Sequence, residues 1–240
     1  MELRNKAAIV TGGSKGIGRA IALALAREGA NVAISARGSD YLERTARDIR
    51  SHGVEALPFA GDMGEESEIK KFVEETVQRF GRLDILVNNA GFGIFHKIAD
   101  FPTDDWDDMF NLNVRGLFIA TRESLSHLRK AGESVIVNVV SLAGKNAFVN
   151  GGGYAATKHA VLGFSRCLFL EERENGVRVL AICPGSVDTS FFDERSNVSQ
   201  TRKQNMLQAE DVAESVLHMI KLKQCAMVSE IDIRPTNPKK

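Results

Sequence analysis

The sequence contains few cysteines and prolines, no excess of either charge and no long hydrophobic run. Its 240 residues include 3 cysteines, 5 prolines and 1 tryptophan, and 31 basic residues balance 31 acidic ones. An odd number of cysteines without CxxC spacing argues against a disulfide framework and a zinc site, and indicates reduced thiols in a cytoplasmic protein. Balanced charge gives no reason to expect nucleic acid or a membrane surface as a partner. No apolar run reaches the ~18 residues of a membrane span, and no signal peptide is recognisable.

Segments with strand and helix patterns alternate along the whole chain. With 43% hydrophobic and 26% charged residues, the composition is typical of a globular protein, and the length suits one large domain over residues 1–240. We expect strands at Lys6–Val10, Asn31–Ser35, Val54–Ala60, Asp84–Val87, Ser134–Val140, Val177–Ile182 and Glu230–Ile233. Helical patterns lie between them. This alternation predicts a doubly wound parallel sheet of about seven strands with helices on both faces.

A glycine-rich turn joins the first predicted strand to the first helix. It reads Thr11-Gly12-Gly13-Ser14-Lys15-Gly16-Ile17-Gly18. Glycines let the backbone approach a pyrophosphate, and the helix N-terminus favours the negative charge of that group. The spacing is not G-x-G-x-x-G, so a simple tight turn is the alternative. In its strand–turn–helix context we interpret the segment as the dinucleotide-binding turn of a single-domain α/β Rossmann fold.

The end of the second predicted strand carries a cation where many such folds carry an acid. Dinucleotide folds specific for NAD place Asp or Glu here to hold the ribose 2′-hydroxyl. This sequence reads Ser35-Ala36-Arg37 and has no carboxylate before Asp40. Arg37 and Lys15 together would suit a 2′-phosphate through charge-assisted hydrogen bonds. We therefore expect NADP(H) rather than NAD(H), with two solvated surface cations as the alternative.

Polar residues also follow the third and fourth predicted strands. Asp62-Met63 comes after the third strand, and Asn88-Asn89-Ala90-Gly91 comes after the fourth. Open parallel sheets bind ligands at the carboxyl ends of their strands. Side-chain amides and a glycine suit the wall of a cofactor cleft.

Tyr154 and Lys158 lie four positions apart, so a helix places them on one face. A phenol normally loses its proton near pH ~10, and a fixed ammonium nearby lowers that value. A tyrosine placed in this way can exchange a proton with a substrate oxygen. Taken alone the spacing is weak evidence, because many helices carry this pair on a solvated face.

Five motifs in order make the chain resemble the short-chain dehydrogenase/reductase family. The turn at 11–18 is similar to TGxxxGxG, and Asn88-Asn89-Ala90-Gly91 is similar to NNAG. Ser141, Tyr154 and Lys158 match the Ser…YxxxK pattern, and Asn113 matches the helix asparagine of the catalytic tetrad. Pro184-Gly185-Ser186-Val187-Asp188-Thr189 matches a PG-x-V-x-T segment. The resemblance covers almost the whole chain.

The resemblance implies a carbonyl/alcohol oxidoreductase with a defined role for each matched residue. Tyr154 exchanges the proton, Ser141 orients the substrate oxygen, and Lys158 lowers the pKa of the tyrosine and holds the nicotinamide ribose. Asn113 anchors a water, Asp62 contacts adenine, and Thr189 meets the carboxamide. The candidate catalytic residues are Asn113, Ser141, Tyr154 and Lys158. The candidate cofactor-binding residues are Gly12, Ser14, Lys15, Gly16, Ile17, Gly18, Arg37, Asp62, Met63, Asn89, Ala90, Gly91, Tyr154, Lys158, Pro184, Gly185, Val187 and Thr189. No metal site is expected.

The family also implies a homo-oligomer, a dimer or a tetramer, built from the long helices around Asn113 and after Tyr154. For the substrate, we expect a lid at about 190–207 and an apolar pocket formed by Phe92, Ile94, Phe148, Phe191 and Phe192, with a core position as the alternative for each of them. The chain lacks the Gly-Gly segment with which 3-oxoacyl-acyl-carrier-protein reductases usually end. That activity stays an alternative to the branch of small carbonyl reductases, and a non-catalytic NADP(H)-sensing protein is a further one.

Overall fold

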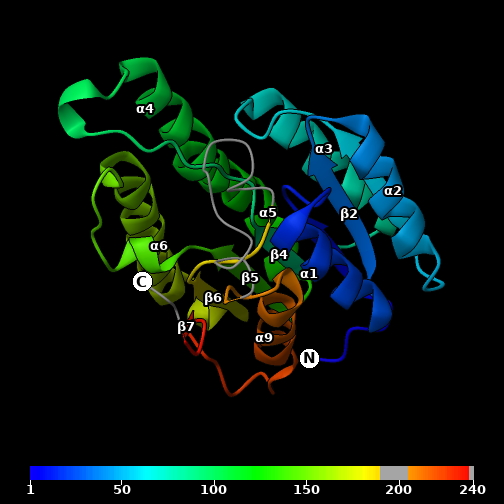
Figure 1. The fold of residues 1–240 in the computed structure, drawn as a ribbon. Helices are drawn as coiled ribbons and strands as arrows, with labels where there is room; N and C mark the ends of the chain where they lie inside the picture. Colours follow the sequence, from blue (N-terminus) through cyan, green and yellow to red (C-terminus); the bar gives the residue numbers. More distant parts are fainter. Residues whose placement is uncertain (190–204, 238–240) are drawn as a thin grey trace.

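The computed structural model describes residues 1–189 and 205–237, and seven parallel strands form one sheet at its centre. The strand order is β3-β2-β1-β4-β5-β6-β7 (Figure 1). The strands are β1 (Ala7–Val10), β2 (Asn31–Ala36), β3 (Ala56–Ala60), β4 (Ile85–Asn88), β5 (Ser134–Val139), β6 (Val177–Pro184) and β7 (Glu230–Ile233). The predicted doubly wound parallel sheet is confirmed, and each expected strand is present.

Helices cover both faces of this sheet. They are α1 (Gly16–Arg27), α2 (Ser39–Arg50), α3 (Glu66–Phe80), α4 (Thr103–Phe110), α5 (Leu117–Lys130), α6 (Gly152–Glu172) and α9 (Ala209–Lys221). The buried residues of α1, α2 and α9 share one hydrophobic cluster, and those of α3 share another with part of α5 and α6. Leu117 of α5 and Val161 and Leu162 of α6 belong to a third, smaller cluster. Successive strand residues point to opposite faces. Ala8 and Val10 therefore join the first cluster, and Ile9 joins the second. Among the described helices, none is long and apolar enough to cross a membrane.

Pro58 lies within β3, although proline cannot donate a hydrogen bond to a neighbouring strand. Strand β3 stands at one edge of the sheet and pairs with β2, where Pro58 is opposite Ile34. An edge strand tolerates proline because its outer side has no strand partner. The strand predicted at Val54–Ala60 thus survives the proline at its middle.

The long helix predicted from Thr103 changes its hydrogen-bond register halfway. Between α4 and α5, residues Asn111–Gly116 form the π-helical turn η2. Gly116 lies against the segment after β3, and an added Cβ would come within 2.1 Å of the Met63 carbonyl oxygen. Short π-helical turns inside α-helices are frequent at functional sites. This turn holds Asn113 in a buried position.

Strand β1 pairs with β2 on one side and β4 on the other, so the chain reverses its winding direction there. In open α/β sheets this switch point leaves a crevice beyond the carboxyl ends of the strands. Asp84 fixes the opposite end of β4: its buried carboxylate accepts hydrogen bonds from the Ala7 backbone N–H (2.9 Å), Lys6 Nζ (3.1 Å) and Arg82 Nε (2.7 Å). The loops that contain the predicted site residues follow the carboxyl ends of the strands, so they converge at this crevice, away from Asp84.

Candidate active site

The glycine turn after β1 leaves no room for side chains at several of its positions. Gly12 has a φ of 66°, in the left-handed region that favours glycine. At Gly18 an added Cβ would lie 2.3 Å from the Gly12 carbonyl oxygen. The turn thus brings bare backbone to the start of α1, where the positive end of the helix dipole favours an anion.

Thr11 and Asn89 tie this turn to the end of β4. The Asn89 side chain donates to the carbonyl oxygens of Thr11 (2.9 Å) and Gly12 (3.1 Å). The Thr11 hydroxyl accepts from the backbone N–H groups of Asn89 and Ala90, both at 3.0 Å. In this structure the predicted cofactor residue Asn89 therefore shapes the turn with its side chain. Thr11 was not among the predicted site residues, although it directly precedes the first glycine and its hydroxyl accepts both of these bonds.

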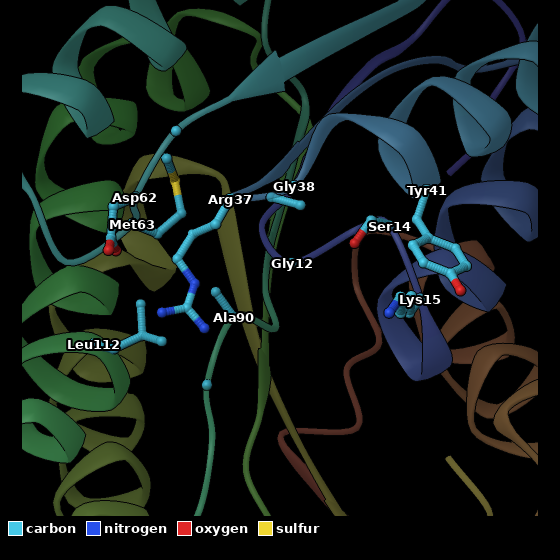
Figure 2. Close-up of a pocket in the computed structure, with 13 residues that line it drawn as sticks. Gly12, Ser14, Lys15, Arg37, Gly38, Tyr41, Asp62, Met63, Ala90 and Leu112 are labelled. Carbon is cyan, nitrogen blue, oxygen red and sulfur yellow. The ribbon is translucent and has the colours of Figure 1, made fainter. Parts of the chain in front are cut away.

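A cavity of about 340 Å³ opens beside the turn, between the carboxyl ends of β1, β2, β3 and β4 (Figure 2). Eight predicted cofactor-binding residues line it: Gly12, Ser14, Lys15, Arg37, Asp62, Met63, Ala90 and Gly91. Five further lining residues were not predicted: Ala36, Gly38, Tyr41, Gly61 and Leu112. The structure thus brings the residues after four strands to one hollow.

Arg37 and Lys15 reach this cavity from two elements. Figure 2 shows Arg37 extending toward Ala90 and Leu112, whereas Lys15 lies beside Tyr41. The Lys15 ammonium is 3.7 Å from the centre of the Tyr41 ring, which is cation–π contact distance. Within residues 1–189 and 205–237, neither cation forms an ion pair with a carboxylate. Both charges are therefore available to an anion that enters the cavity.

The other predicted cofactor residues lie around the same edge. The Asp62 carboxylate accepts a hydrogen bond from the Gly64 backbone N–H at 2.8 Å, and Met63 is buried. An added Cβ on Gly16 would meet the Thr189 side chain at 3.2 Å, so the segment after β6 passes next to the glycine turn. That segment begins at Pro184, continues through Gly185 and pairs Val187 with Leu207. Ile17 packs against the core cluster of α1.

Ser141, Tyr154 and Lys158 come together where β5 ends and α6 begins. Ser141 lies two positions after Val139, the last residue of β5, and its hydroxyl accepts a hydrogen bond from the Ala143 backbone N–H at 3.1 Å. The side chains of Ser141 and Tyr154 are hydrogen-bonded to each other. The buried Lys158 ammonium donates to the Val139 carbonyl oxygen at 3.0 Å and lies 5.7 Å from the centre of the Tyr154 ring. The predicted juxtaposition of all three side chains is present.

The acidities in this group differ from the sequence expectation. Burial raises the pKa of Tyr154 to about 12, against the lowering effect of its hydrogen bond with Ser141. Burial also lowers the pKa of Lys158 to about 8. The helix spacing predicts instead that the ammonium lowers the tyrosine pKa. In the structure the loss of water around the phenol outweighs such help, because the ammonium is engaged with Val139 and is itself buried.

Asn113 connects three parts of the site through its side-chain amide. Its Nδ2 donates to the Phe92 carbonyl oxygen (2.8 Å) and to the Thr157 hydroxyl (3.2 Å), and its Oδ1 accepts from the Phe92 backbone N–H (3.0 Å). These bonds hold the loop after β4 against α6. Gly91 lies beside the same amide, since an added Cβ there would be 2.8 Å from Asn113 Oδ1. The π-helical turn thus aims Asn113 at the centre of the site.

Phe148 and Ile94, two residues of the expected apolar pocket, lie in different surroundings. Phe148 contacts Phe95, and Phe95 in turn contacts the Tyr154 ring. Ile94 is buried, and its backbone N–H donates to the Met109 sulfur at 3.2 Å. Phe191 and Phe192, and most of the lid expected at 190–207, lie outside the described residues. Sequence reasoning missed Phe95, because nothing in its local pattern distinguishes it from the neighbouring phenylalanines.

A doubly wound sheet, a close-packed glycine turn and a Ser–Tyr–Lys group at the carboxyl edge define the class of an α/β oxidoreductase. Comparison with known proteins agrees with this class. The family model described as short chain dehydrogenase matches residues 6–200. An uncharacterized oxidoreductase of Staphylococcus aureus (strain MRSA252) is 33% identical over 233 residues, which are 97% of this chain and 98% of that protein.

Two solved structures share the fold over nearly their whole length. The alcohol dehydrogenase from Thermococcus sibiricus, complexed with 5-hydroxy-NADP, has a TM-score of 0.89 and 30% identity, covering 98% of this chain and 99% of that one. The 3-ketoacyl-(acyl-carrier-protein) reductase from Brucella melitensis, complexed with NADH, has a TM-score of 0.89 and 29% identity, covering 98% of each chain. The chain belongs to the short-chain dehydrogenase family and is an oxidoreductase.

Proposed function

We propose that the protein is an NADP(H)-dependent oxidoreductase that interconverts a carbonyl group and an alcohol, with Tyr154 as the acid and base. The observation that carries this proposal is the hydrogen-bonded Ser141–Tyr154 pair with the buried ammonium of Lys158 beside it. A buried phenol at the carboxyl edge of the sheet, next to a second hydroxyl, has the geometry that proton transfer to a substrate oxygen requires.

The cavity beside the glycine turn suits the adenosine and pyrophosphate part of a dinucleotide. The bare backbone at Gly12 and Gly18 admits a pyrophosphate, and Arg37 and Lys15 have charge available for the 2′-phosphate of NADP(H). Asp62 and Met63 would lie along the adenine end, and Gly91 and Thr189 toward the nicotinamide. When bound, the cofactor supplies or accepts the hydride.

Tyr154 and Ser141 act on the substrate oxygen. With a pKa of about 12, Tyr154 holds its proton at neutral pH and is ready to donate it when a carbonyl is reduced. Ser141 donates a hydrogen bond to the same oxygen and fixes its position, as preorganised donors do for a developing negative charge. The Ala143 backbone N–H orients the serine hydroxyl from behind.

Lys158 and Asn113 support the tyrosine after it gives up its proton. The pKa of about 8 keeps most Lys158 side chains charged at pH 7, and a nearby cation stabilises the phenolate that remains. Asn113 holds the loop after β4 and the Thr157 hydroxyl of α6 in one network. When Tyr154 loses its proton, the negative phenolate is thus stabilised by Lys158 until Tyr154 is protonated again.

The acid–base role is tested by Tyr154→Phe, which removes only the hydroxyl. We expect turnover to fall by about 10²- to 10⁴-fold, the usual contribution of a general acid. NADPH binding, followed by fluorescence, and the melting temperature should stay near the wild-type values, and they serve as the control for folding. Wild-type turnover in the variant would disprove the assignment.

The cofactor preference is tested by Arg37→Asp, which reverses the charge at the end of β2. The ratio of kcat/KM with NADPH to kcat/KM with NADH should fall in the variant, because a carboxylate repels a 2′-phosphate and accepts a bond from a 2′-hydroxyl. Lys15→Gln is the companion variant, since it removes the second cation but adds no negative charge. An unchanged ratio in both variants would show that neither Arg37 nor Lys15 reads the 2′-phosphate.

Two alternatives give different results in the same assays. A 3-oxoacyl-acyl-carrier-protein reductase is favoured by the similarity to the Brucella melitensis enzyme, and it would prefer a 3-oxoacyl thioester on a carrier over any free ketone. A non-catalytic NADP(H) sensor would bind NADPH tightly and oxidise none of it with any carbonyl. Partner binding that survives Tyr154→Phe would indicate an additional interaction role.

We also infer a homo-oligomer formed through α5 and α6. Phe118 on α5 and Leu170 on α6 are exposed, and the Phe118 ring meets the Phe164 ring of α6 edge-on at 6.4 Å. Large apolar side chains exposed on neighbouring helices favour a partner surface. Sedimentation of Phe118→Asp should show a smaller species than the wild type, whereas an unchanged mass would exclude this face.

A further inference from the structure

A second aromatic ring touches the proposed acid. The Phe95 ring meets the Tyr154 ring edge-on, with centroids 5.7 Å apart and planes at 70°. Phe148 continues the row, 5.9 Å from Phe95. Phe95 lies in the loop after β4, and Phe148 lies in the segment that leads to α6. Two loops far apart in sequence therefore extend an aromatic row outward from the phenol.

Exposed apolar side chains gather at the outer end of this row. Six large hydrophobic side chains are exposed among the described residues, and three of them belong to these two loops. Val149 is 86% exposed, Ile98 is 69% exposed and Phe148 is 48% exposed. We call Phe95, Ile98, Phe148 and Val149 the aromatic patch. Exposed apolar side chains that cluster beside a reactive group mark a binding surface rather than ordinary scatter.

Two glycines hold the aromatic patch against the start of α6. An added Cβ on Gly151 would lie 2.3 Å from the Phe148 ring, and one on Gly152 would lie 2.4 Å from Ile98 Cδ1. The side chains of Phe148 and Ile98 thus rest on bare backbone immediately before Tyr154. The patch is therefore joined to the catalytic helix and reaches the phenol through Phe95, within range of a group attached to a carbonyl bound at Tyr154.

We propose that the aromatic patch binds an aromatic ring attached to the substrate carbonyl, so that the substrate class is aryl ketones and aryl aldehydes. A flat ring can meet Phe95 and Phe148 edge-on or offset, the arrangements that aromatic pairs prefer. This inference rests on the proposed function. The reaction is unchanged: the carbonyl carbon gains a hydride, its oxygen gains the proton of Tyr154, the C=O π bond is lost, and the nicotinamide cofactor is oxidised.

The test compares phenyl methyl ketone with cyclohexyl methyl ketone, which has the same number of carbon atoms but no aromatic ring. Phe95→Leu keeps the apolar surface and removes the phenyl group. We expect kcat/KM for the phenyl ketone to fall by about 2- to 10-fold, chiefly through KM, and the value for the cyclohexyl ketone to change by less than about 2-fold. Phe110→Leu is the matched control, because Phe110 stacks on Trp106 in α4, 4.8 Å away, and belongs to neither loop.

Each other outcome has a distinct meaning. If the wild type reduces no carbonyl with NADPH or NADH, the proposed function itself fails. If it reduces both ketones and Phe95→Leu slows them equally, Phe95 only supports Tyr154 and the aryl proposal is overturned. If Val149→Asp lowers the mass in sedimentation while the ketone selectivity is unchanged, a second copy of the chain covers the patch, which also overturns it.

Discussion

Replacing Lys158 by Met should make the fold more stable at neutral pH while it damages the active site. Burial lowers the pKa of Lys158 from 10.5 to about 8, a depression of roughly 2.5 units. At about 1.4 kcal/mol per pKa unit, keeping this ammonium charged at neutral pH destabilises the folded state by about 3 kcal/mol. Met fills a similar volume but cannot donate to the Val139 carbonyl oxygen, and that loss costs about 1–2 kcal/mol. We expect the variant to be more stable by about 1–2 kcal/mol at pH 7.

The pH dependence gives a sharper test than the absolute value. Because the folded pKa of Lys158 is depressed, the unfolded chain binds more protons between pH 8 and 10.5, and the wild type gains stability relative to the variant as pH rises. The advantage of Lys158→Met should therefore be constant below about pH 7 and shrink by up to about 1.4 kcal/mol per pH unit above pH 8. Urea unfolding without cofactor at several values from pH 6.5 to 9.5 measures it.

Lys145 provides the matched control for this experiment. Although burial by itself lowers the pKa of Lys145, its hydrogen bonds to Asp232 and Glu230 leave that pKa above its usual value. Lys145→Met should destabilise the fold by an amount that does not change between pH 6.5 and 9.5, since the folded and unfolded chains are both protonated there. Parallel stability curves for wild type and Lys158→Met would refute the buried-cation argument.

Three further predictions follow from the geometry of the site and of β4. Tyr41→Leu should raise KM for NADPH by about 2- to 5-fold, because Lys15 loses the ring that positions it. Tyr41→Phe keeps the ring, so its KM for NADPH should stay within about 2-fold of the wild-type value. Equal effects of both variants in steady-state kinetics would contradict this role of the ring. Asp84→Ala should lower the free energy of unfolding in urea by about 3 kcal/mol, because it leaves the Ala7 N–H and Arg82 without their acceptor. Asp48→Ala, at the exposed pair with Arg19, should lower it by less than ~1 kcal/mol. Comparable losses of stability in the two variants would show that burial is not decisive. For carbonyl reduction, kcat/KM should fall above about pH 8 as Lys158 loses its charge, and a reduction rate that is flat to pH 10 would contradict this role of Lys158. Alcohol oxidation should rise with pH, since it needs the phenolate of Tyr154, and an oxidation rate that does not rise would contradict this role of Tyr154.

The sequence was sufficient for the parallel sheet because strand residues such as Ile9 and Val10 bury both faces and the glycines mark the turns. It also placed Ser141, Tyr154 and Lys158 together, since a strand end and one helix face fix their positions. The π-helical turn at Asn111–Gly116 was not predictable in this way. Its register depends on the close approach of Gly116 to the backbone of Met63, a contact between segments about fifty positions apart.

The residues missed by sequence reasoning share one cause. Phe95 and Tyr41 acquire their roles from side chains on other elements, Tyr154 and Lys15 respectively, and no local pattern encodes those contacts. The direction of the Tyr154 pKa shift was missed for the same reason. Spacing on a helix reports that Lys158 is near, but it does not report how completely the surrounding loops remove water from both groups.

Burial has opposite meanings for folding and for chemistry at this site. It makes both Tyr154 and Lys158 favour their neutral forms, so a charged Lys158 at pH 7 destabilises the fold. A methionine at the same position would pack without that cost, and the single hydrogen bond to the Val139 carbonyl oxygen does not offset the cost of burying a cation. The ammonium becomes useful when Tyr154 gives up its proton, because a phenolate in a site with little water needs a fixed positive charge nearby. A residue that weakens the folded state and stabilises a charge formed during reaction is best explained by catalysis.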